Sequence, residues 1–390
     1  MPPVDEDFAE IDVEALAAWI RAADSPLVID VREPDEHAAG VLLNARLLPL
    51  GGIDGWIDGF PARPDRAIVV YCAAGSRSAE AARRLRNRGC RRVHSLRGGI
   101  EAWRRRGEPL CAPGELGSQA LGTPQFDRYA RQLRLPEVGI EGQEKLLRAR
   151  VLCIGAGGIG SSACLYLAAA GVGQIAIVDD DVVAASNLQR QILHTTPRIG
   201  MLKTDSAARA IGELNPDVRV RLHPARLGAG NALDLLADCD VVVDGSDNFA
   251  TRYLVNDAAL RLGKPLVFGA VLRYEAQLAV FTGAPCYRCL FPSPAPAEFA
   301  PSCAEAGVLG VVPGLVGVLQ AAEALKLILG IGATPAGQLV TFDAWTMDFG
   351  KLAIRANPEC PVCAPGVDRS RLELRDDVPP RPATQPGCVP

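Results

Sequence analysis

A run of glycines that follows a short apolar segment is the first feature with chemical meaning. The apolar residues are 151–154, and the glycines after them are Gly155, Gly157, Gly158 and Gly160. Such glycines let the backbone approach a phosphate closely at the N-terminus of the next helix, where free N–H groups and the helix dipole favour an anion. The stretch therefore predicts a nucleotide site built as strand, turn, helix and strand.

Charged residues downstream of the glycines indicate which nucleotide binds. Asp179 lies 24 residues after Gly155, about where such folds bind a ribose hydroxyl. A glycine fingerprint with a downstream acid most often marks a dinucleotide site, so a nicotinamide-dependent oxidoreductase is the alternative. Two cations and a second acid favour a triphosphate with Mg²⁺ instead. The polar residues in question are Asn187, Arg190, Lys203 and Asp247.

A second reactive group is a cysteine in a short loop that runs from Cys72 to Ser78. We expect this loop to follow a strand over 67–71 and to lead into a helix over 78–88. There the thiolate is stabilised by backbone N–H groups and by the helix dipole. Four residues separate Cys72 from Arg77, one fewer than in cysteine phosphatases, so the loop suits a sulfur atom on the cysteine better than a phosphate. The alternative is a buried cysteine in an inactive domain.

Two C-x-x-C pairs are expected to bind metal. Each such turn presents two sulfurs to one ion, and four thiolates form a tetrahedral structural zinc site. We expect no catalysis from this Zn²⁺ because four protein ligands leave no open position. Two unrelated pairs or a dithiol redox centre are the alternatives. The four residues are Cys286, Cys289, Cys360 and Cys363.

The elements that position these groups divide the chain into segments. Residues 1–112 alternate strand and helix patterns and predict a small parallel α/β domain. Residues 113–122, rich in Gly, Pro and Ser, predict a linker. Residues 123–366 predict a doubly wound, Rossmann-like domain with β-rich additions at 275–281 and 338–343. Residues 367–390, with several prolines and mixed charge, predict a disordered tail.

Composition narrows the class of protein. A 390-residue chain with 48% hydrophobic residues and a net charge of -4 offers no basic surface for nucleic acid. Residues 1–25 lack the pattern of a secretory signal. The apolar stretch 308–332 contains Glu323 and Lys326, which favours a buried helix over a membrane span. Twelve cysteines without such a signal favour a reducing compartment, so we expect a cytoplasmic protein.

The first unit resembles the rhodanese domain of sulfurtransferases. The shared segments are VIDVREPDEH near residue 30, C-x-x-G-x-R-S at 72–78 and LRGGIEAW at 96–103, although GVLLNA at 40–45 replaces the usual G-H-I-x-G-A. The resemblance implies that Cys72 carries sulfur as a persulfide. We expect the Arg77 cation to favour the thiolate and an incoming anionic donor.

The second unit resembles the MoeB/ThiF family of ubiquitin-activating-like enzymes. The shared motifs include RYxRQ, GAGGIGS, SNLQRQ after three aspartates, DGSDN, the paired C-x-x-C and the loop from Cys303 to Gly307. The resemblance implies ATP-dependent adenylation of the C-terminal Gly-Gly carboxylate of a ubiquitin-like sulfur carrier. It also implies a homodimer in which Arg131 reaches the phosphates of the neighbouring subunit.

Together the two resemblances imply an enzyme that adenylates and thiolates its carrier, for molybdopterin, thiamine or a related cofactor. The relatives place the rhodanese domain last, whereas here it is first. We expect Arg190 and Lys203 to neutralise phosphates, Asp247 to hold Mg²⁺ and Asp179 to bind ribose. Cys303 is expected to attack an acyl disulfide or to link covalently to the carrier, or else to be an incidental thiol. A catalytically idle carrier-binding scaffold is a further alternative.

Overall fold

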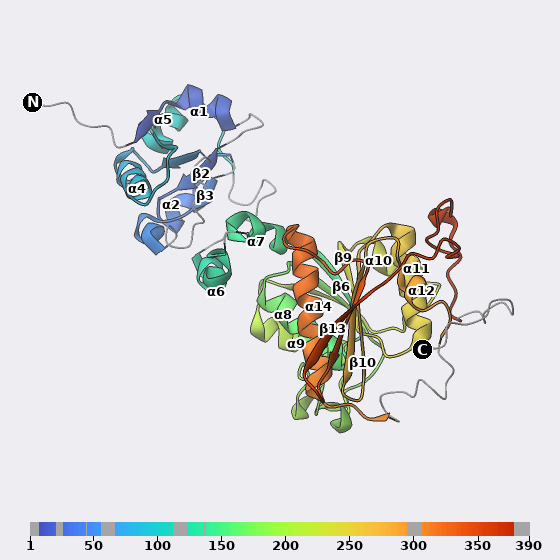
Figure 1. Cartoon of the computed structure of the whole chain (residues 1–390). Helices are drawn as coiled ribbons and strands as arrows, with labels where there is room; N and C mark the ends of the chain where they lie inside the picture. The colour runs from blue at the N-terminus through green and yellow to red at the C-terminus, as the bar shows by residue number, and fades with distance from the viewer. Residues whose placement is uncertain are drawn as a thin grey trace, which may run out of the picture. The chain divides into compact units, whose positions relative to one another are not determined.

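The computed structural model describes residues 8–20, 26–43, 45–55, 67–111, 123–135, 137–294 and 306–377. The chain forms two compact units, residues 1–144 and 145–390 (Figure 1), and the division falls within helix α7 (Gly139–Arg148). The predicted linker at 113–122 and Cys303 lie outside the described residues.

The first unit is built on a five-stranded sheet in which every neighbouring pair is parallel. The order is β1-β5-β4-β2-β3, so β4 lies at the centre, and all four of its residues are buried. This confirms the predicted small parallel α/β domain. The strands are β1 (Ala9–Ile11), β2 (Leu27–Asp30), β3 (Ala45–Leu47), β4 (Ile68–Tyr71) and β5 (Val93–Leu96).

Two helices of this unit, α1 and α5, share a core with the sheet. Leu16 of α1 and Trp103 of α5 belong to the same buried cluster as Val69, Tyr71 and Leu96 of the sheet. The helices are α1 (Val13–Ile20), α2 (Pro34–Ala38), α4 (Ser76–Asn87), α5 (Gly99–Arg105) and α6 (Thr123–Leu133), with a 3-10 turn η1 (Leu50–Gly52).

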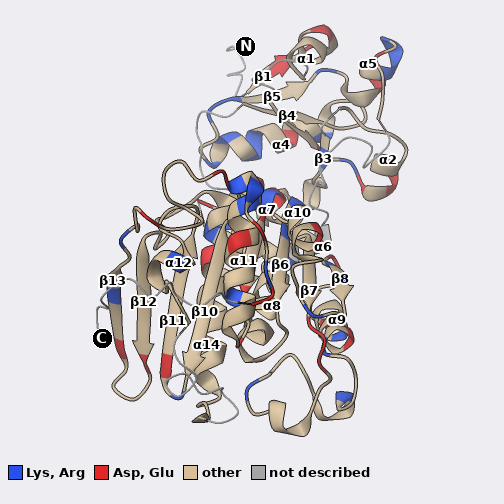
Figure 2. Ribbon diagram, turned by 90° about the vertical axis from the view of Figure 1, so that its right-hand side faces the viewer, with Lys and Arg blue, Asp and Glu red and all other residues tan. Residues whose placement is uncertain are grey.

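The second unit contains an eight-stranded mixed sheet, whose order is β13-β12-β11-β10-β9-β6-β7-β8 (Figure 2). The five strands from β10 to β8 are parallel to one another, and the three at the other edge are antiparallel. The strands are β6 (Arg150–Ile154), β7 (Gln174–Val178), β8 (Arg219–His223), β9 (Val241–Asp244), β10 (Leu266–Leu272), β11 (Glu275–Phe281), β12 (Gln338–Asp343) and β13 (Asp348–Ala353).

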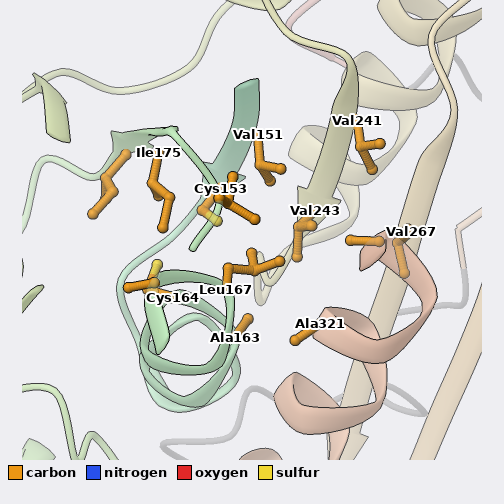
Figure 3. Close-up of a cluster of buried hydrophobic side chains, with 14 of the residues drawn as sticks. Val151, Cys153, Ala163, Cys164, Leu167, Ile175, Val241, Val243, Val267 and Ala321 are labelled. Atoms are coloured by element: carbon orange, nitrogen blue, oxygen red, sulfur yellow. The ribbon is translucent and has the colours of Figure 1, made fainter. Parts of the chain in front are cut away.

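Helices lie on both faces of this sheet, which confirms the doubly wound prediction. Because side chains of a strand alternate between faces, Val151 and Cys153 of β6 enter one core (Figure 3), whereas Leu152 and Ile154 enter the other. The first core is covered by α8 (Gly158–Ala169), α9 (Lys203–Leu214) and α14 (Val311–Leu329), and the second by α10 (Ala232–Ala237) and α11 (Phe249–Leu262).

Helix α14 is long and apolar enough to cross a membrane by length and composition alone. It packs instead along α8 and the sheet, with Ala321 and Ala324 fully buried in the core. At the crossing, a side chain on Gly317 would overlap the Ile159 carbonyl of α8, so glycine permits the close approach of the two helices. The prediction of a buried helix fits this packing.

The structure corrects the predicted disordered tail for residues 367–377. A 3-10 turn, η5 (Arg369–Arg371), is followed by Leu372, whose carbonyl accepts a hydrogen bond of 2.8 Å from Arg261. Leu374 packs against the core under α10 and α11, and Asp376 accepts from the amide of Ala229 at 2.6 Å. Proline and charge content misled the prediction, because the segment is held by Leu372, Leu374 and these hydrogen bonds. Residues 378–390 lie outside the described part of the chain.

Candidate active sites

The glycine loop joins β6 to α8 and leaves the helix N-terminus uncapped by any side chain. Gly155 takes a φ of 86°, which favours glycine, and a side chain on Gly160 would overlap the Gly155 carbonyl. Gly157 and Gly158 line a cavity, whereas Gly160 contributes close packing. The loop therefore presents backbone N–H groups to an anion in that cavity.

The cavity has a volume of about 410 Å³ and lies at the carboxyl ends of three adjacent parallel strands, β9, β6 and β7. The chain leaves β6 towards β7 on one side and returns to β9 on the other, which is the point where open α/β sheets bind ligands. The polar residues that line it are Asp179, Asp180, Asp181, Arg190, Gln191, Lys203, Arg226, Ser246, Asp247, Asn248, Thr251 and Arg252.

Two of the predicted residues at this cavity are held by the loop that follows β7. The Asp179 carboxylate accepts hydrogen bonds from the amides of Ala156 at 2.8 Å and Asp181 at 2.9 Å, which ties the glycine loop to the end of β7. The buried Lys203 ammonium lies 2.6 Å from the exposed Asp181 carboxylate. Lys203 therefore has its cation at the cavity wall with a displaceable partner.

Of the other predicted residues, two line the cavity and two do not. Arg190 lines the cavity and donates to the carbonyl of Ser186 at 3.1 Å, and the exposed Asp247 lines it at the end of β9. Asn187 accepts from the Ala184 amide at 3.1 Å within η2 (Ala185–Asn187), and it is not among the lining residues. Arg131 is exposed on α6, within the first unit.

Sequence reasoning missed further cations and polar groups at the cavity. Arg252, on the first turn of α11, donates to the Ser246 carbonyl at 3.0 Å, and Arg226 lines the wall near the end of β8. The side-chain oxygen Oε1 of Gln191 and the Ser246 hydroxyl are buried there without a hydrogen-bond partner among the described residues. Arg252 lies five residues after Asp247, in the first turn of the helix that follows β9, and this spacing is the sequence signal that could have found it.

A buried histidine supports the glycine loop. His194 Nε2 lies 2.9 Å from the Ala156 carbonyl, to which only an N–H can donate, and Nδ1 lies 2.9 Å from the Ser206 hydroxyl. Burial lowers the pKa of His194, so the ring is neutral and Nδ1 accepts from Ser206. The histidine thus positions the loop.

The reactive cysteine of the first unit lies directly after β4. The Cys72 sulfur is 3.0 Å from the Gly75 amide and 3.6 Å from the Ser78 hydroxyl. Burial by itself raises the pKa of Cys72, but hydrogen bonds from Ser78 and from the amides of Ser78, Gly75 and Ala74 outweigh it, so the pKa lies below its ordinary value. The loop therefore favours a thiolate mainly through hydrogen bonds.

Helix α5 fixes the shape of this loop. The amides of Ile100 and Glu101 donate to the carbonyls of Cys72 at 2.9 Å and Ala73 at 3.1 Å. A side chain on Gly99, which has a φ of 58°, would overlap both carbonyls. The LRGGIEAW segment thus holds the loop in place. The amides at the N-terminus of its helix bind the loop carbonyls, so the loop amides stay directed at the Cys72 sulfur.

The loop arginine differs in its contacts from what we expected. Arg77 donates through both terminal nitrogens to the Glu36 carboxylate, and each distance is 2.7 Å. We expected its cation to favour the thiolate and an incoming anionic donor. The pKa of Arg77 is raised by the hydrogen-bonded Glu36 carboxylate first and by the Cys72 thiolate to a smaller extent, so the guanidinium attracts the thiolate while Glu36 engages it.

The structure brings the four predicted metal-binding cysteines together. Their ligand atoms lie within 4.8 Å of one another, with 3.7 Å between Cys286 and Cys360 and 3.4 Å between Cys289 and Cys363. A tetrahedron with metal–sulfur bonds of about 2.3 Å has edges of about 3.8 Å, so the thiols fit one tetrahedral ion. The Asn357 amide, 3.4 Å from the Cys289 sulfur, supplies an additional hydrogen bond.

Comparisons with known families decide between the interpretations of this arrangement. Residues 129–362 match the ThiF family, and residues 12–106 match the rhodanese-like domain. The chain belongs to the ThiF family. This confirms both resemblances, because the ThiF match contains the cavity and three of the four cysteines, Cys286, Cys289 and Cys360, and the rhodanese-like match contains the Cys72 loop.

Curated relatives of this ThiF family member are named enzymes. The chain is 54% identical over 259 residues to a sulfur carrier protein adenylyltransferase of Thermus thermophilus, a match that covers 65% of this chain and 95% of the relative. It is 48% identical over 266 residues to a probable adenylyltransferase/sulfurtransferase MoeZ of Mycobacterium tuberculosis, a match that covers 67% of each chain. Among solved structures, Escherichia coli MccB in complex with MccA-N7isoAsn is similar in fold, with a TM-score of 0.55, 22% identity and coverage of 61% of this chain and 75% of MccB.

Proposed function

We propose that this ThiF family member uses ATP to adenylate the C-terminal Gly-Gly carboxylate of a ubiquitin-like sulfur carrier, and then delivers sulfur from Cys72 to form the carrier thiocarboxylate. One observation carries the proposal: Arg190, Lys203 and Asp247 converge on the cavity that the glycine loop borders. The names of the curated relatives support the same two activities.

The residues at the cavity suit attack by a carboxylate on the α-phosphate. A peptide C-terminus is ionised at neutral pH, so it needs no general base. The carboxylate oxygen forms a bond to the α-phosphorus while the bond to the β-phosphate oxygen breaks, which gives an acyl adenylate and pyrophosphate. What limits this step is charge repulsion and positioning. Arg190 and Lys203 reduce the repulsion, and binding of the phosphates by Lys203 releases its ion pair with Asp181.

The acidic residues at the cavity suit a magnesium ion and a ribose. Asp247 offers an exposed carboxylate to Mg²⁺, which when bound neutralises phosphate charge, and the clustered carboxylates of Asp179, Asp180 and Asp181 lie at the same cavity. We assign the ribose hydroxyls to Asp179. Both of its oxygens keep acceptor capacity after their single amide hydrogen bonds, and those bonds hold the carboxylate in place.

Sulfur transfer follows on the acyl adenylate. The terminal sulfur of a Cys72 persulfide attacks the acyl carbon and AMP leaves, which gives a carrier acyl disulfide. A second thiolate, which we assign to Cys303, then attacks the Cys72 sulfur and releases the thiocarboxylate, leaving a Cys72–Cys303 disulfide that a dithiol reductant reopens. In the alternative order, Cys303 first displaces AMP and links the carrier covalently.

We further propose that the four clustered cysteines hold one structural Zn²⁺. Their sulfur separations support this, as does the chemistry of four thiolates. When bound, the ion joins the turn after β11 to the segment after β13, two parts of the fold that are far apart in sequence. It has no place in the adenylation step.

The cellular setting follows from the same proposal. We infer a cytoplasmic homodimer in which Arg131 of one subunit contacts the phosphates bound by the other. The thiocarboxylate then serves molybdopterin, thiamine or a related sulfur-containing cofactor. Thiosulfate and a cysteine-desulfurase persulfide are the candidate sulfur donors.

A pyrophosphate-exchange assay tests the proposed function. The full chain is mixed with ATP, labelled pyrophosphate and each of a panel of recombinant ubiquitin-like proteins that end in Gly-Gly. We expect label to enter ATP only when a carrier is present, because exchange requires a reversible acyl adenylate. No exchange with any carrier would favour the idle scaffold, and oxidation of a substrate with reduction of a nicotinamide would favour the oxidoreductase.

A further inference from the structure

The arginine of the sulfur-transfer loop is held by a carboxylate from a distant part of the domain. Arg77 on α4 and Glu36 on α2 form two parallel hydrogen bonds, both of 2.7 Å. The two side chains are 32% and 31% exposed, so the pair lies at the surface beside the loop. Paired hydrogen bonds of this kind between guanidinium and carboxylate add geometric specificity to an ion pair as well as energy.

Glu36 is fixed in this position by its own helix. Its Oε2 atom also accepts from the Glu33 amide at 3.1 Å, as part of a capping box at the start of α2. The hydrogen bond from Arg77 and then that from Glu33 lower the pKa of Glu36 to about 2, so the carboxylate is ionised at neutral pH. The Arg77–Glu36 pair therefore carries no net charge.

Among the described residues around the pair, no other charged residue replaces the positive charge of Arg77 that Glu36 neutralises. Arg32 donates to the Glu36 carbonyl at 2.8 Å, but it is buried and pairs with Asp30 at 2.7 Å. Glu33 adds a further negative charge near Arg77. Hydrogen bonds from amides and a hydroxyl supply most of the stabilisation of the Cys72 thiolate, and Arg77, the loop's one charged residue, attracts both the thiolate and a donor.

The two donor classes differ in the charge they bring. With thiosulfate, the Cys72 thiolate attacks the outer sulfur, the S–S bond breaks and sulfite leaves as a dianion. With a thiol persulfide, the thiolate attacks the outer sulfur, the S–S bond breaks and a thiolate leaves and takes the persulfide proton. Both reactions produce the Cys72 persulfide. The first gathers three negative charges at the loop, and the second gathers one or two.

We propose that Glu36 is a specificity-determining residue of the sulfur-transfer loop: by neutralising Arg77 it disfavours dianionic thiosulfate and leaves a thiol persulfide as the donor. This inference rests on the proposed sulfurtransferase function and selects between its two donors. Like-charge repulsion acts most on the more highly charged donor, so its removal raises the thiosulfate rate selectively.

The test compares two donors with full-length protein. Persulfide formation on Cys72 is measured with thiosulfate and with the persulfide of an N-acetylated cysteine amide, which has no other charge. We expect Glu36→Gln to raise kcat/KM for thiosulfate about tenfold, because it removes one negative charge and releases the Arg77 cation. We expect kcat/KM for the persulfide to change less than twofold.

Two further variants separate charge from folding. Glu80→Gln is a matched control, because Glu80 pairs with Arg83 and Arg84 on α4 and has no contact with Arg77 among its hydrogen bonds. This variant should leave the donor ratio unchanged. Adding Glu36→Gln to an Arg77→Gln background should raise the donor ratio less than it does in the wild-type background, because only the direct repulsion by Glu36 is then removed. That result distinguishes charge neutralisation from a structural effect of Glu36.

The outcomes separate the inference from the function it rests on. If the wild-type chain forms no persulfide on Cys72 from either donor, the proposed sulfurtransferase function fails. If it does, and Glu36→Gln leaves the donor ratio unchanged or lowers kcat/KM for thiosulfate, the inference is wrong and Glu36 instead holds Arg77 in a productive position. Melting temperatures of all variants show whether any loss reflects unfolding.

Discussion

The Cys72 loop and the Gly155 loop both follow a fully buried stretch of strand and lead into a helix, from β4 to α4 and from β6 to α8. Each contains a glycine with positive φ, 109° at Gly75 and 86° at Gly155. Each directs backbone amides at an anion. The two loops thus share a backbone arrangement that binds anions. They differ in chemistry because different side chains surround that backbone.

The two loops differ in where those side chains originate. In the first unit the nucleophile, its hydrogen-bond donors and its arginine lie within seven consecutive residues, from Cys72 to Ser78. In the second unit the charged groups follow three separate strands and no nucleophile is among them. A thiolate that forms bonds itself needs only local support, whereas two anionic substrates must be brought together by charges collected from across a sheet.

The largest expected effect is the loss of adenylation when Asp247 is changed, because this change should affect the second unit and not the first. Asp247→Asn keeps the shape of an exposed side chain but removes the charge that we assign to Mg²⁺, so we expect carrier-dependent pyrophosphate exchange to fall by about 10²–10³-fold. Persulfide formation on Cys72 should stay within twofold of wild type. Asp234→Asn, exposed on α10 and outside the cavity, is the control. An unchanged exchange rate would remove Asp247 from the site.

A second test asks whether the clustered cysteines stabilise only their own unit. Purified protein is expected to contain about one zinc per chain, and Cys360→Ser should lose it and lower the melting temperature of the unit at 145–390. Structural zinc contributes roughly 10–16 kcal/mol in small peptides, so the loss should be readily visible. Cys90→Ser, in the first unit, should retain the metal. An identical melting profile without metal would contradict a structural zinc site.

The smallest effect sharpens the account of the Cys72 loop. Ser78→Ala removes a hydrogen bond that lowers the pKa of Cys72, so the pKa rises and the thiolate fraction at pH 7 falls. The pH profile of alkylation by iodoacetamide should shift to higher pH, and the rate at pH 7 should drop several-fold. The exposed Ser76→Ala is the control. A profile that does not move would assign the stabilisation to the loop amides alone.

How far the sequence predicted each region follows from the same difference. The residues of the Cys72 loop could be predicted almost completely because they are contiguous in the sequence. The phosphate-binding glycine loop could be predicted for the same reason. Arg226 was missed because only the strand order places the end of β8 at the cavity, whereas Arg252 had a local signal, its spacing from Asp247, that was not recognised. Glu36 was missed because 41 residues separate it from Arg77, and no local pattern reports that contact.

The central claim is that sulfur activation and adenylation use separate groups in the two units. Its most direct test is carrier-dependent pyrophosphate exchange by Cys72→Ala, measured with the carrier that supports the fastest exchange by the wild-type chain. We predict exchange within twofold of wild type, together with complete loss of thiosulfate cleavage and of thiocarboxylate formation. Loss of exchange in a folded Cys72→Ala protein would contradict the claim, because the Cys72 loop would then be part of the adenylation site.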